Sequence, residues 1–342
     1  MVSFQCDYTT GAHPAILQRF AETNMIPQPG YGDDEFTLSA KEKIRAACGC
    51  PEAEVELLVG GTQTNAVVIS TMLHDYEGVV TADTGHINVH EAGAIEFGGH
   101  KVLALPGKDA KLAAPVLQEF LEAFYENPSR DHMVFPGMVY ITFPTELGTL
   151  YTLEELTALS AICRQYQIPL YMDGARLGYG LASRQTDVTL QDIVRLTDVF
   201  YIGGTKVGAL CGEAIVFTHG NRPPHFLTQI KRRGALLAKG RVLGLQFDTL
   251  FTDDLYMKIS RHAIDMAERL KEIIRDKGWE FYRESPTNQQ FILIPDEEME
   301  ALGKTVQFEP WERYDKDRYI IRLATSWCTT QEDLDTLAAF TR

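Results

Sequence analysis

Short apolar runs alternate with longer amphipathic segments through most of this 342-residue chain. Seven runs predict strands, because they are short, rich in β-branched and aromatic residues and bounded by turn residues: Val55–Val59, Gly78–Thr81, Lys101–Leu105, Met138–Phe143, Pro169–Met172, Val199–Ile202 and Glu213–Phe217. Helical periodicity appears between them at Asn65–Tyr76, Lys111–Tyr125 and Leu153–Tyr166. Strands that alternate with helices indicate βαβ units, so we expect an α/β fold on a mainly parallel, seven-stranded sheet.

The pattern differs at both ends of the chain. The first residues predict an extended arm with one short helix near Pro14–Asn24, and an amphipathic helix follows at Ser39–Cys48. Beyond about Gly244, a long helix at Leu255–Lys277 precedes three strands and a final helix from Thr330. The three strands are expected near Trp279–Tyr282, Gln290–Ile294 and Tyr319–Leu323. We interpret the chain as an N-terminal arm (1–30) that contributes to the site, a large domain (31–244) and a small α+β domain (245–342).

The formal net charge of −15 limits the partners of the protein. It argues against nucleic acid or an anionic membrane as a main partner. The six cysteines include no CxxC pair, and Cys48-Gly-Cys50 lacks a second pair for zinc, so we expect reduced thiols and no metal site. No signal peptide and no membrane span are expected. These features predict a soluble, cytoplasmic protein.

Two predicted strands end in residues that suit one cofactor. Asp173 follows the run Pro169–Met172, and Lys206 follows Val199–Ile202 after a Gly-Gly-Thr turn. Ligands of open α/β sheets collect at the carboxyl ends of strands. Pyridoxal phosphate needs a lysine for its Schiff base and an acid for its ring nitrogen. Each residue alone has another explanation, since an Asp after a strand often caps a helix and a loop Lys is usually solvated.

A phosphate site is predicted where Gly60-Gly-Thr-Gln-Thr-Asn65 follows a strand and opens a helix. Free N–H groups and the positive end of the helix dipole favour an anion there, and Thr62 adds a hydroxyl. The alternative is an ordinary turn between strand and helix. His86, just after another strand, offers a flat ring that can stack on the cofactor, whereas His90 is interpreted as a bystander.

Two arginines are candidates for binding anions. Arg322 lies within the apolar run Tyr319–Ala324, where an unpaired charge is costly. A guanidinium binds a carboxylate through two parallel hydrogen bonds, so an amino-acid substrate is one expected partner and an internal Asp or Glu is the other. Arg176, three residues after Asp173, is placed to reach the cofactor phosphate.

Taken together, these residues resemble the threonine aldolase and β-eliminating lyase family of pyridoxal phosphate enzymes of fold type I. The similar motifs are Tyr31-Gly-Asp-Asp34, Gly60-Gly-Thr-Gln63, His86 with Glu91 and Gly93, Asp173-Gly-Ala-Arg176 and Thr205-Lys206. The resemblance implies that Lys206 carries the cofactor, Asp173 binds the pyridine nitrogen, His86 stacks on the ring, and Gly61 and Thr62 hold the phosphate. It also implies that Arg176 lies near the cofactor oxygens or the substrate carboxylate, and that Arg322 binds that carboxylate.

The resemblance has further implications for assembly and for the substrate. Arg241 falls where the family reaches the phosphate of a neighbouring subunit, which implies a homodimer or homotetramer with shared sites. The chain departs from the family at two positions. Cys6 replaces the serine that touches the substrate, and Glu146 replaces a histidine that assists the aldol chemistry. The chain therefore looks like a divergent branch.

The expected activity is cleavage of L-threonine, L-allo-threonine or a related β-hydroxy-α-amino acid to glycine and an aldehyde. Candidate bases for the β-hydroxyl proton are His86, Glu146 and an ordered water. The alternatives are a pyridoxal-phosphate-dependent β-eliminating lyase or aminotransferase, and more remotely a non-catalytic protein of the same fold. A Rossmann dehydrogenase is disfavoured because Gly60–Asn65 lacks the GxGxxG spacing.

Overall fold

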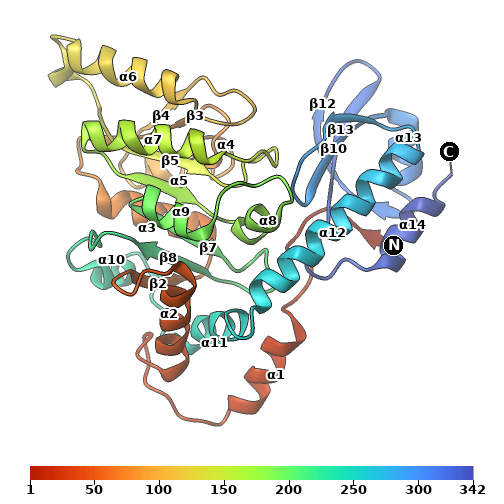
Figure 1. The fold of residues 1–342 in the computed structure, drawn as a ribbon, viewed down its shortest axis with the longest axis horizontal. Helices are drawn as coiled ribbons and strands as arrows, with labels where there is room; N and C mark the ends of the chain where they lie inside the picture. The colour runs from red at the N-terminus through yellow and green to blue at the C-terminus, as the bar shows by residue number, and fades with distance from the viewer. Residues whose placement is uncertain (342) are drawn as a thin grey trace.

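A computed structural model describes residues 1–341, which form two lobes with the long helix α12 (Leu255–Asp276) running between them (Figure 1). The larger lobe contains a seven-stranded sheet with the order β2-β8-β7-β6-β5-β3-β4. Its strands are β2 (Glu54–Leu58), β3 (Glu77–Ala82), β4 (Val102–Leu105), β5 (Phe135–Thr142), β6 (Leu170–Asp173), β7 (Val199–Gly203) and β8 (Glu213–Phe217). Only β8 runs antiparallel to its neighbours, so the prediction of a mainly parallel seven-stranded sheet is confirmed.

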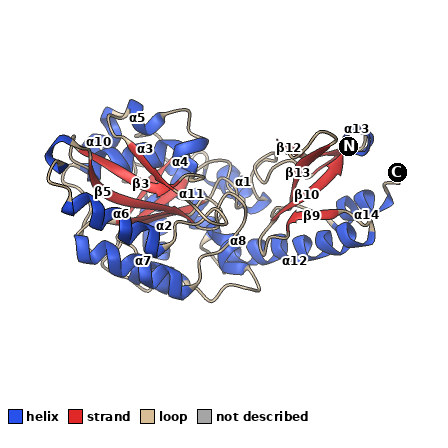
Figure 2. Cartoon of the chain, turned by 90° about the horizontal axis from the view of Figure 1, so that it is seen from above, coloured by secondary structure: helices blue, strands red, loops and turns tan. Residues whose placement is uncertain are grey.

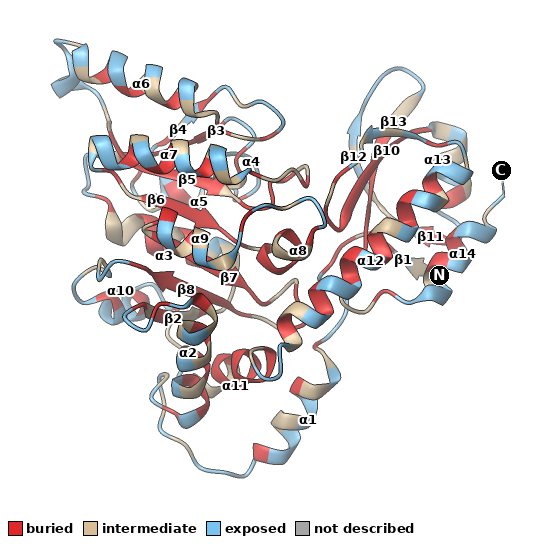
Figure 3. Ribbon diagram, viewed as in Figure 1, coloured by how far each residue is buried: buried red, intermediate tan, exposed pale blue. Residues whose placement is uncertain are grey.

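Helices cover both faces of this sheet, as the view from above shows (Figure 2). The helices that precede α12 are α1 (Pro14–Thr23), α2 (Glu35–Cys48), α3 (Gly61–Met72), α4 (His86–Val89), α5 (Ala94–Phe97), α6 (Ala114–Glu126), the short 3₁₀ helix η1 (Arg130–His132), α7 (Leu153–Tyr166), α8 (Leu177–Ala182), α9 (Leu190–Leu196), α10 (Phe226–Arg232) and α11 (Arg241–Leu250). Buried residues lie along the strands and on the inner sides of these helices (Figure 3).

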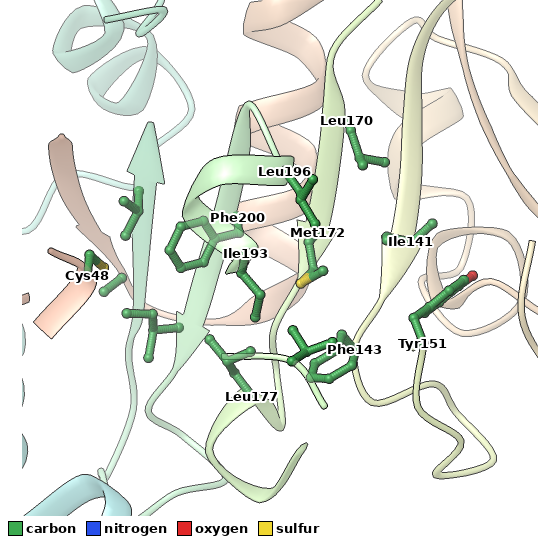
Figure 4. Close-up of a cluster of buried hydrophobic side chains, with 14 of the residues drawn as sticks. Cys48, Ile141, Phe143, Tyr151, Leu170, Met172, Leu177, Ile193, Leu196 and Phe200 are labelled. Atoms are coloured by element: carbon green, nitrogen blue, oxygen red, sulfur yellow. The ribbon is translucent and has the colours of Figure 1, made fainter. Parts of the chain in front are cut away.

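The two faces of the sheet differ because successive side chains of a strand point to opposite sides. Leu170 and Met172 of β6 and Phe200 of β7 join the core that α7 and α9 cover, drawn in Figure 4. The intervening Tyr171 and Tyr201 join a second core, which α3, α5 and α10 cover. Asp173 follows Tyr171 by two residues and therefore lies on this second face.

The smaller lobe is an α+β layer. Its antiparallel sheet has the order β12-β13-β10-β9, formed by β9 (Glu280–Arg283), β10 (Gln289–Pro295), β12 (Glu309–Arg313) and β13 (Arg318–Ala324). Helices α12, α13 (Asp296–Leu302) and α14 (Gln331–Ala339) accompany it. The first residues of the predicted arm form β1 (Val2–Ser3), which pairs in parallel with β11 (Val306–Gln307), and Phe4 is fully buried in the core of this lobe. The N-terminus therefore lies in the smaller lobe (Figure 1).

Several helix boundaries differ from the prediction for local reasons. Helix α2 begins at Glu35 rather than Ser39, because the Asp34 carboxylate accepts a hydrogen bond from the N–H of Thr37 at 2.9 Å and caps the helix one turn earlier. Helix α3 begins at Gly61 and ends at Met72, so it includes the turn expected before Asn65.

Helix α11 was not predicted from the sequence. A Cβ at Gly244 would lie 2.2 Å from the Thr37 hydroxyl, so this glycine allows α11 to pack closely on α2. The interpreted boundary between residues 244 and 245 falls inside this buried helix. No helix within residues 1–341 has the length and apolarity needed to cross a membrane.

Candidate active site

Asp173 ends strand β6 with a carboxylate that is only 1% exposed. Its Oδ1 accepts hydrogen bonds from Tyr201 Oη at 2.5 Å and from the N–H of Ala175 at 2.9 Å. Its Oδ2 accepts from Tyr140 Oη at 2.5 Å and from Asn65 Nδ2 at 3.1 Å. Burial acts to raise the pKa of Asp173, but His86 and then the two phenols lower it below its usual range.

Lys206 lies in the loop after β7, which the structure folds tightly against the turn after β6. A Cβ at Gly203 would lie 2.2 Å from the carbonyl oxygen of Ala175, so the close approach requires glycine. Glu213 fixes the same loop, because its carboxylate accepts from Thr205 Oγ1 at 2.8 Å and from the N–H of Gly204 at 3.2 Å. Burial, helped by the charge of Arg176, lowers the pKa of the Lys206 amine, which favours its nucleophilic neutral form.

A cavity of about 900 Å³ brings five of the candidate residues together, but Asp173, Gly61, Thr62 and Cys6 are not among its lining residues. Its lining includes His86, Glu146, Arg176, Lys206 and Arg322, although these come from five separate segments of the chain. The ring of Tyr8 adds an aromatic wall with its centroid 5.8 Å from Lys206 Nζ. A second cavity of about 800 Å³, between α2 and the start of α12, is lined mainly by apolar residues and contains none of the candidates.

His86 is the first residue of α4 and lies half-buried near Asp173 and Lys206. Burial lowers the pKa of His86 to about 4, and the negative charge of Asp173 offsets only part of this effect. The imidazole is therefore neutral at physiological pH, which suits a ring that stacks on a cofactor better than one that carries a charge.

Glu146 lies in the loop after β5, and its buried carboxyl borders the cavity. Its Oε1 accepts a hydrogen bond from Thr142 Oγ1 at 2.8 Å, while its Oε2 has no partner among residues 1–341. Burial raises the pKa of Glu146 to about 7. The backbone N–H groups of Glu146 and His86 and the bond from Thr142 oppose the rise, and the charge of Asp173 adds to it. A carboxyl with a free oxygen and a pKa near neutrality suits proton transfer.

Arg322, on β13, is 7% exposed and has no acidic partner within the described part of the chain. Its guanidinium donates to Gln289 Oε1 at 3.2 Å, to the carbonyl of Gln5 at 3.1 Å and to Cys6 Sγ at 3.2 Å, and its Nε is buried without a partner. The alternative that Arg322 pairs with an internal Asp or Glu is therefore wrong. A buried guanidinium without a carboxylate partner at the edge of a cavity suits a ligand carboxylate.

Arg176 has a different partner from the one expected. Its Nε and Nη2 donate to the two carboxylate oxygens of Asp7 at 2.6 and 3.0 Å, so the N-terminal segment neutralises this arginine. Asn288 also donates to Asp7, at 3.0 Å. Asp7 and Cys6 together place the N-terminal segment against both arginines of the cavity.

The predicted phosphate site lies at the start of α3. The first intrahelical bond runs from the N–H of Thr64 to the carbonyl of Gly60, so the N–H groups of Gly61 and Thr62 have no intrahelical acceptor. A Cβ at Gly61 would crowd the Tyr201 hydroxyl at 3.1 Å, so this glycine keeps the phenol close to both the helix start and Asp173.

Arg241 does not join these residues within the single chain. Its guanidinium donates to the carbonyl oxygens of Ile26 at 2.7 Å and Thr23 at 2.8 Å, at the end of α1 and just beyond it. Its approach to the phosphate of a neighbouring subunit stays a prediction.

The arrangement fits pyridoxal phosphate. The site provides a buried acid held by four donors, a lysine that opens on the cavity, and the N–H groups of Gly61 and Thr62 at the start of α3, which have no intrahelical acceptor. In addition, Glu146 Oε2 and Arg322 Nε are buried polar atoms without a protein partner. These are the complements that the pyridine nitrogen, aldehyde, phosphate and an amino-acid substrate require.

The sheet and these residues define a fold type I enzyme of the pyridoxal phosphate class. The β-eliminating lyase family matches residues 3–296, and the chain belongs to this family. It is 29% identical to a low specificity L-threonine aldolase of Pseudomonas sp. (strain NCIMB 10558), over 98% of this chain and 96% of that protein. The structure of a Leishmania major threonine aldolase superposes with a TM-score of 0.95 at 39% identity, covering 99% of this chain and 98% of that one.

A more distant solved structure, of SPT with bound pyridoxal phosphate, shares the fold with a TM-score of 0.72 at 14% identity, covering 98% of this chain and 85% of that one. The family resemblance and the fold predicted from the sequence are thus confirmed.

Several neighbours of the candidate residues were not predicted. They are Asp7, Asn65, Tyr140, Tyr201 and Glu213. The tyrosines carry a signal in hindsight, because a phenol in a buried strand needs a hydrogen-bond partner and both strands end at the site. Nothing in the sequence indicates that the partner of both is Asp173.

Proposed function

We propose that this protein is a pyridoxal-phosphate-dependent aldehyde-lyase that cleaves L-threonine, L-allo-threonine or a related β-hydroxy-α-amino acid to glycine and an aldehyde. The observation that carries the proposal is that Lys206, Glu146 and Arg322 line one cavity. A lysine, a base and a carboxylate-binding arginine are the groups that the reaction needs from the protein. The threonine aldolases among the relatives support the same activity.

Five residues would hold the cofactor, which supplies an electron sink for the bond broken at Cα. Lys206 would bind it through its amine, Asp173 would accept a hydrogen bond from its ring nitrogen, and His86 would cover its ring. The N–H groups of Gly61 and Thr62 would bind the phosphate. Arg176 is neutralised by Asp7, so its contribution is to shape the site rather than to supply an unpaired charge.

The remaining groups act on the substrate. Arg322 binds the substrate carboxylate through its Nε edge, and Cys6 helps to orient the guanidinium. Glu146 takes the proton of the β-hydroxyl through its free Oε2. It suits this role better than His86, because an imidazole with a pKa of about 4 is a weak base at neutral pH, whereas a carboxyl with a pKa of about 7 is matched to it.

We also propose a homodimer or homotetramer with shared sites. Exposed apolar side chains on α1, the following loop and α2 (Leu17, Met25, Ile26 and Leu38) support an interface beside Arg241. Analytical ultracentrifugation together with Arg241→Ala tests this point. Weaker cofactor binding by an intact oligomer supports the proposed role of Arg241, and a monomer in solution contradicts the assembly.

The activity is tested by incubating the purified holoenzyme separately with L-threonine and L-allo-threonine. Acetaldehyde is measured by coupled oxidation of NADH and glycine by chromatography. Equal amounts of the two products are expected. A 2-oxo acid with ammonia indicates β-elimination instead, and a 2-oxo acid with aminated cofactor indicates transamination.

A further inference from the structure

Two buried phenols bind one carboxylate at the centre of the site. Tyr140 Oη and Tyr201 Oη each lie 2.5 Å from a different oxygen of Asp173. This is the range of charge-assisted O–H···O⁻ bonds, which are about twice as strong as neutral ones. Both tyrosines are almost completely buried, so water does not compete for these bonds.

The sheet explains how two distant residues meet there. Strands β5, β6 and β7 are neighbours, and Tyr140 of β5 is paired with Tyr171 of β6. Tyr140, Tyr171 and Tyr201 all lie on the face covered by α3, and Asp173 emerges on that face one alternation after Tyr171. The flanking tyrosines therefore reach Asp173 from both sides, while the Tyr171 hydroxyl donates instead to Asn65 Oδ1 at 2.7 Å.

The phenols remain donors throughout the physiological pH range. Burial, and next the negative charge of Asp173, raises the pKa values of Tyr140 and Tyr201 well above their usual range. His86 is neutral above a pH of about 4 and so cannot hold Asp173 ionised at neutral pH. At neutral pH, the hydrogen bonds from the two phenols, Asn65 and Ala175 therefore keep Asp173 ionised despite the cost of its burial.

We propose that Tyr140 and Tyr201 are positioning residues that keep Asp173 ionised and oriented toward the ring nitrogen of the cofactor. The proton between Asp173 and the ring nitrogen then stays on the nitrogen. The inference rests on the proposed function only through its assignment of pyridoxal phosphate. A carboxylate that already accepts four hydrogen bonds has a low affinity for a further proton. Without the phenols, the shared proton shifts toward Asp173 and the ring loses positive charge.

Other titratable and charged groups also face Asp173, from every surrounding element. They are His86 on α4, Glu91 after α4, Glu146 after β5, Tyr171 on β6, Lys206 after β7 and Glu213 on β8. All of these groups are retained in Tyr140→Phe and Tyr201→Phe. Tyr171→Phe is the matched control, because it removes a buried hydroxyl from the same sheet face that bonds Asn65 rather than Asp173 itself, and it therefore measures the indirect effect that passes through Asn65.

The test uses the holoenzyme with ¹⁵N-labelled pyridoxal phosphate and reads the ring nitrogen by NMR, together with the affinity of the apoprotein for the cofactor between pH 5 and 9. Each lost phenol is expected to raise the proton affinity of Asp173 roughly tenfold or more. In Tyr140→Phe/Tyr201→Phe the ¹⁵N resonance should move toward that of unprotonated pyridine. As the pH drops through the raised pKa of Asp173, its cofactor affinity should fall more steeply than that of wild type and Tyr171→Phe, which share with it the titration of Glu91, Glu146 and Glu213.

A resonance and pH profile of the double variant equal to those of Tyr171→Phe would overturn the proposal. The melting temperature of each apoprotein identifies a folding defect, and the two single variants carry the test if the double variant does not fold. In Asp173→Asn, adding Tyr201→Phe should cause no further loss of affinity. A wild type that binds the cofactor but releases no aldehyde overturns the proposed activity alone, whereas one that binds no cofactor overturns both.

Discussion

The two faces of the central sheet use the same strands for different purposes. On one face of β6, Leu170 and Met172 pack in an apolar core (Figure 4). On the other face, Tyr171 and Asp173 belong to a network of hydrogen bonds. Successive residues of the strand therefore have different roles, one in the apolar core and the next in the candidate active site. Substitutions on the two faces should separate stability from activity.

The largest effect is expected at the polar end of the sheet. Lys206→Ala should abolish turnover and the absorbance band of the lysine-bound cofactor, because no other group on the cavity replaces its amine. Absorbance spectra and aldehyde detection measure the two effects. The exposed Lys101→Ala serves as the control and should retain both. Normal turnover in Lys206→Ala would rule out the assigned role of this residue.

Adjacent residues of β6 test the comparison directly. Asp173→Asn should lower kcat on the order of 10²-fold or more, since it removes the charge opposite the ring nitrogen, while the protein stays folded. Met172→Ala should instead cost about 2–5 kcal/mol of unfolding free energy through the cavity it leaves. Its activity per folded molecule should be retained. Urea unfolding and kcat on the same samples provide both values, and a parallel loss of both in each variant contradicts the separation.

Two buried glutamates sharpen the comparison within the polar face. Burial raises the pKa values of Glu146 and Glu91 each to about 7, but only Glu146 borders the cavity. As a base, Glu146 must be ionised, so kcat/KM of the wild type should fall about tenfold per pH unit below pH about 7.

Glu146→Gln should lower kcat roughly 10²-fold or more and remove this acidic limb, whereas Glu91→Gln should keep the limb. The measurement is a pH profile of kcat/KM for the three proteins. If the acidic limb persists in Glu146→Gln and disappears in Glu91→Gln, then Glu91 rather than Glu146 is the base.

Local patterns in the sequence predicted the large sheet well, because each of its strands is a short apolar run between turn residues. Strand β12 was missed, since Glu309-Pro-Trp-Glu-Arg313 is mostly polar. It lies at the edge of its sheet, where a proline is tolerated and one side faces water. Helix α11 was also missed, and its Gly244 allows it to pack closely against α2.

The site was predictable only as far as single segments carry it. Asp173 and Lys206 each follow their own strand, so the sequence indicates both. The donors to Asp173 come from strands 33 and 28 residues away, and Asp7 reaches Arg176 across 169 residues. Such contacts depend on strand order and on where the N-terminal segment lies, and neither has a local signal.

The smallest expected effect concerns the junction of the two lobes. Arg322→Lys should raise KM roughly 10- to 100-fold with a smaller change in kcat, because an ammonium cannot form the paired hydrogen bonds of a guanidinium with a carboxylate. Arg318→Lys, on the same strand but half-buried and paired with Glu280 and Asp315, should leave KM unchanged. Steady-state kinetics with L-threonine measure both. An unaltered KM in Arg322→Lys would mean that the substrate carboxylate binds elsewhere, and that the unpartnered Nε of Arg322 has a purely structural explanation.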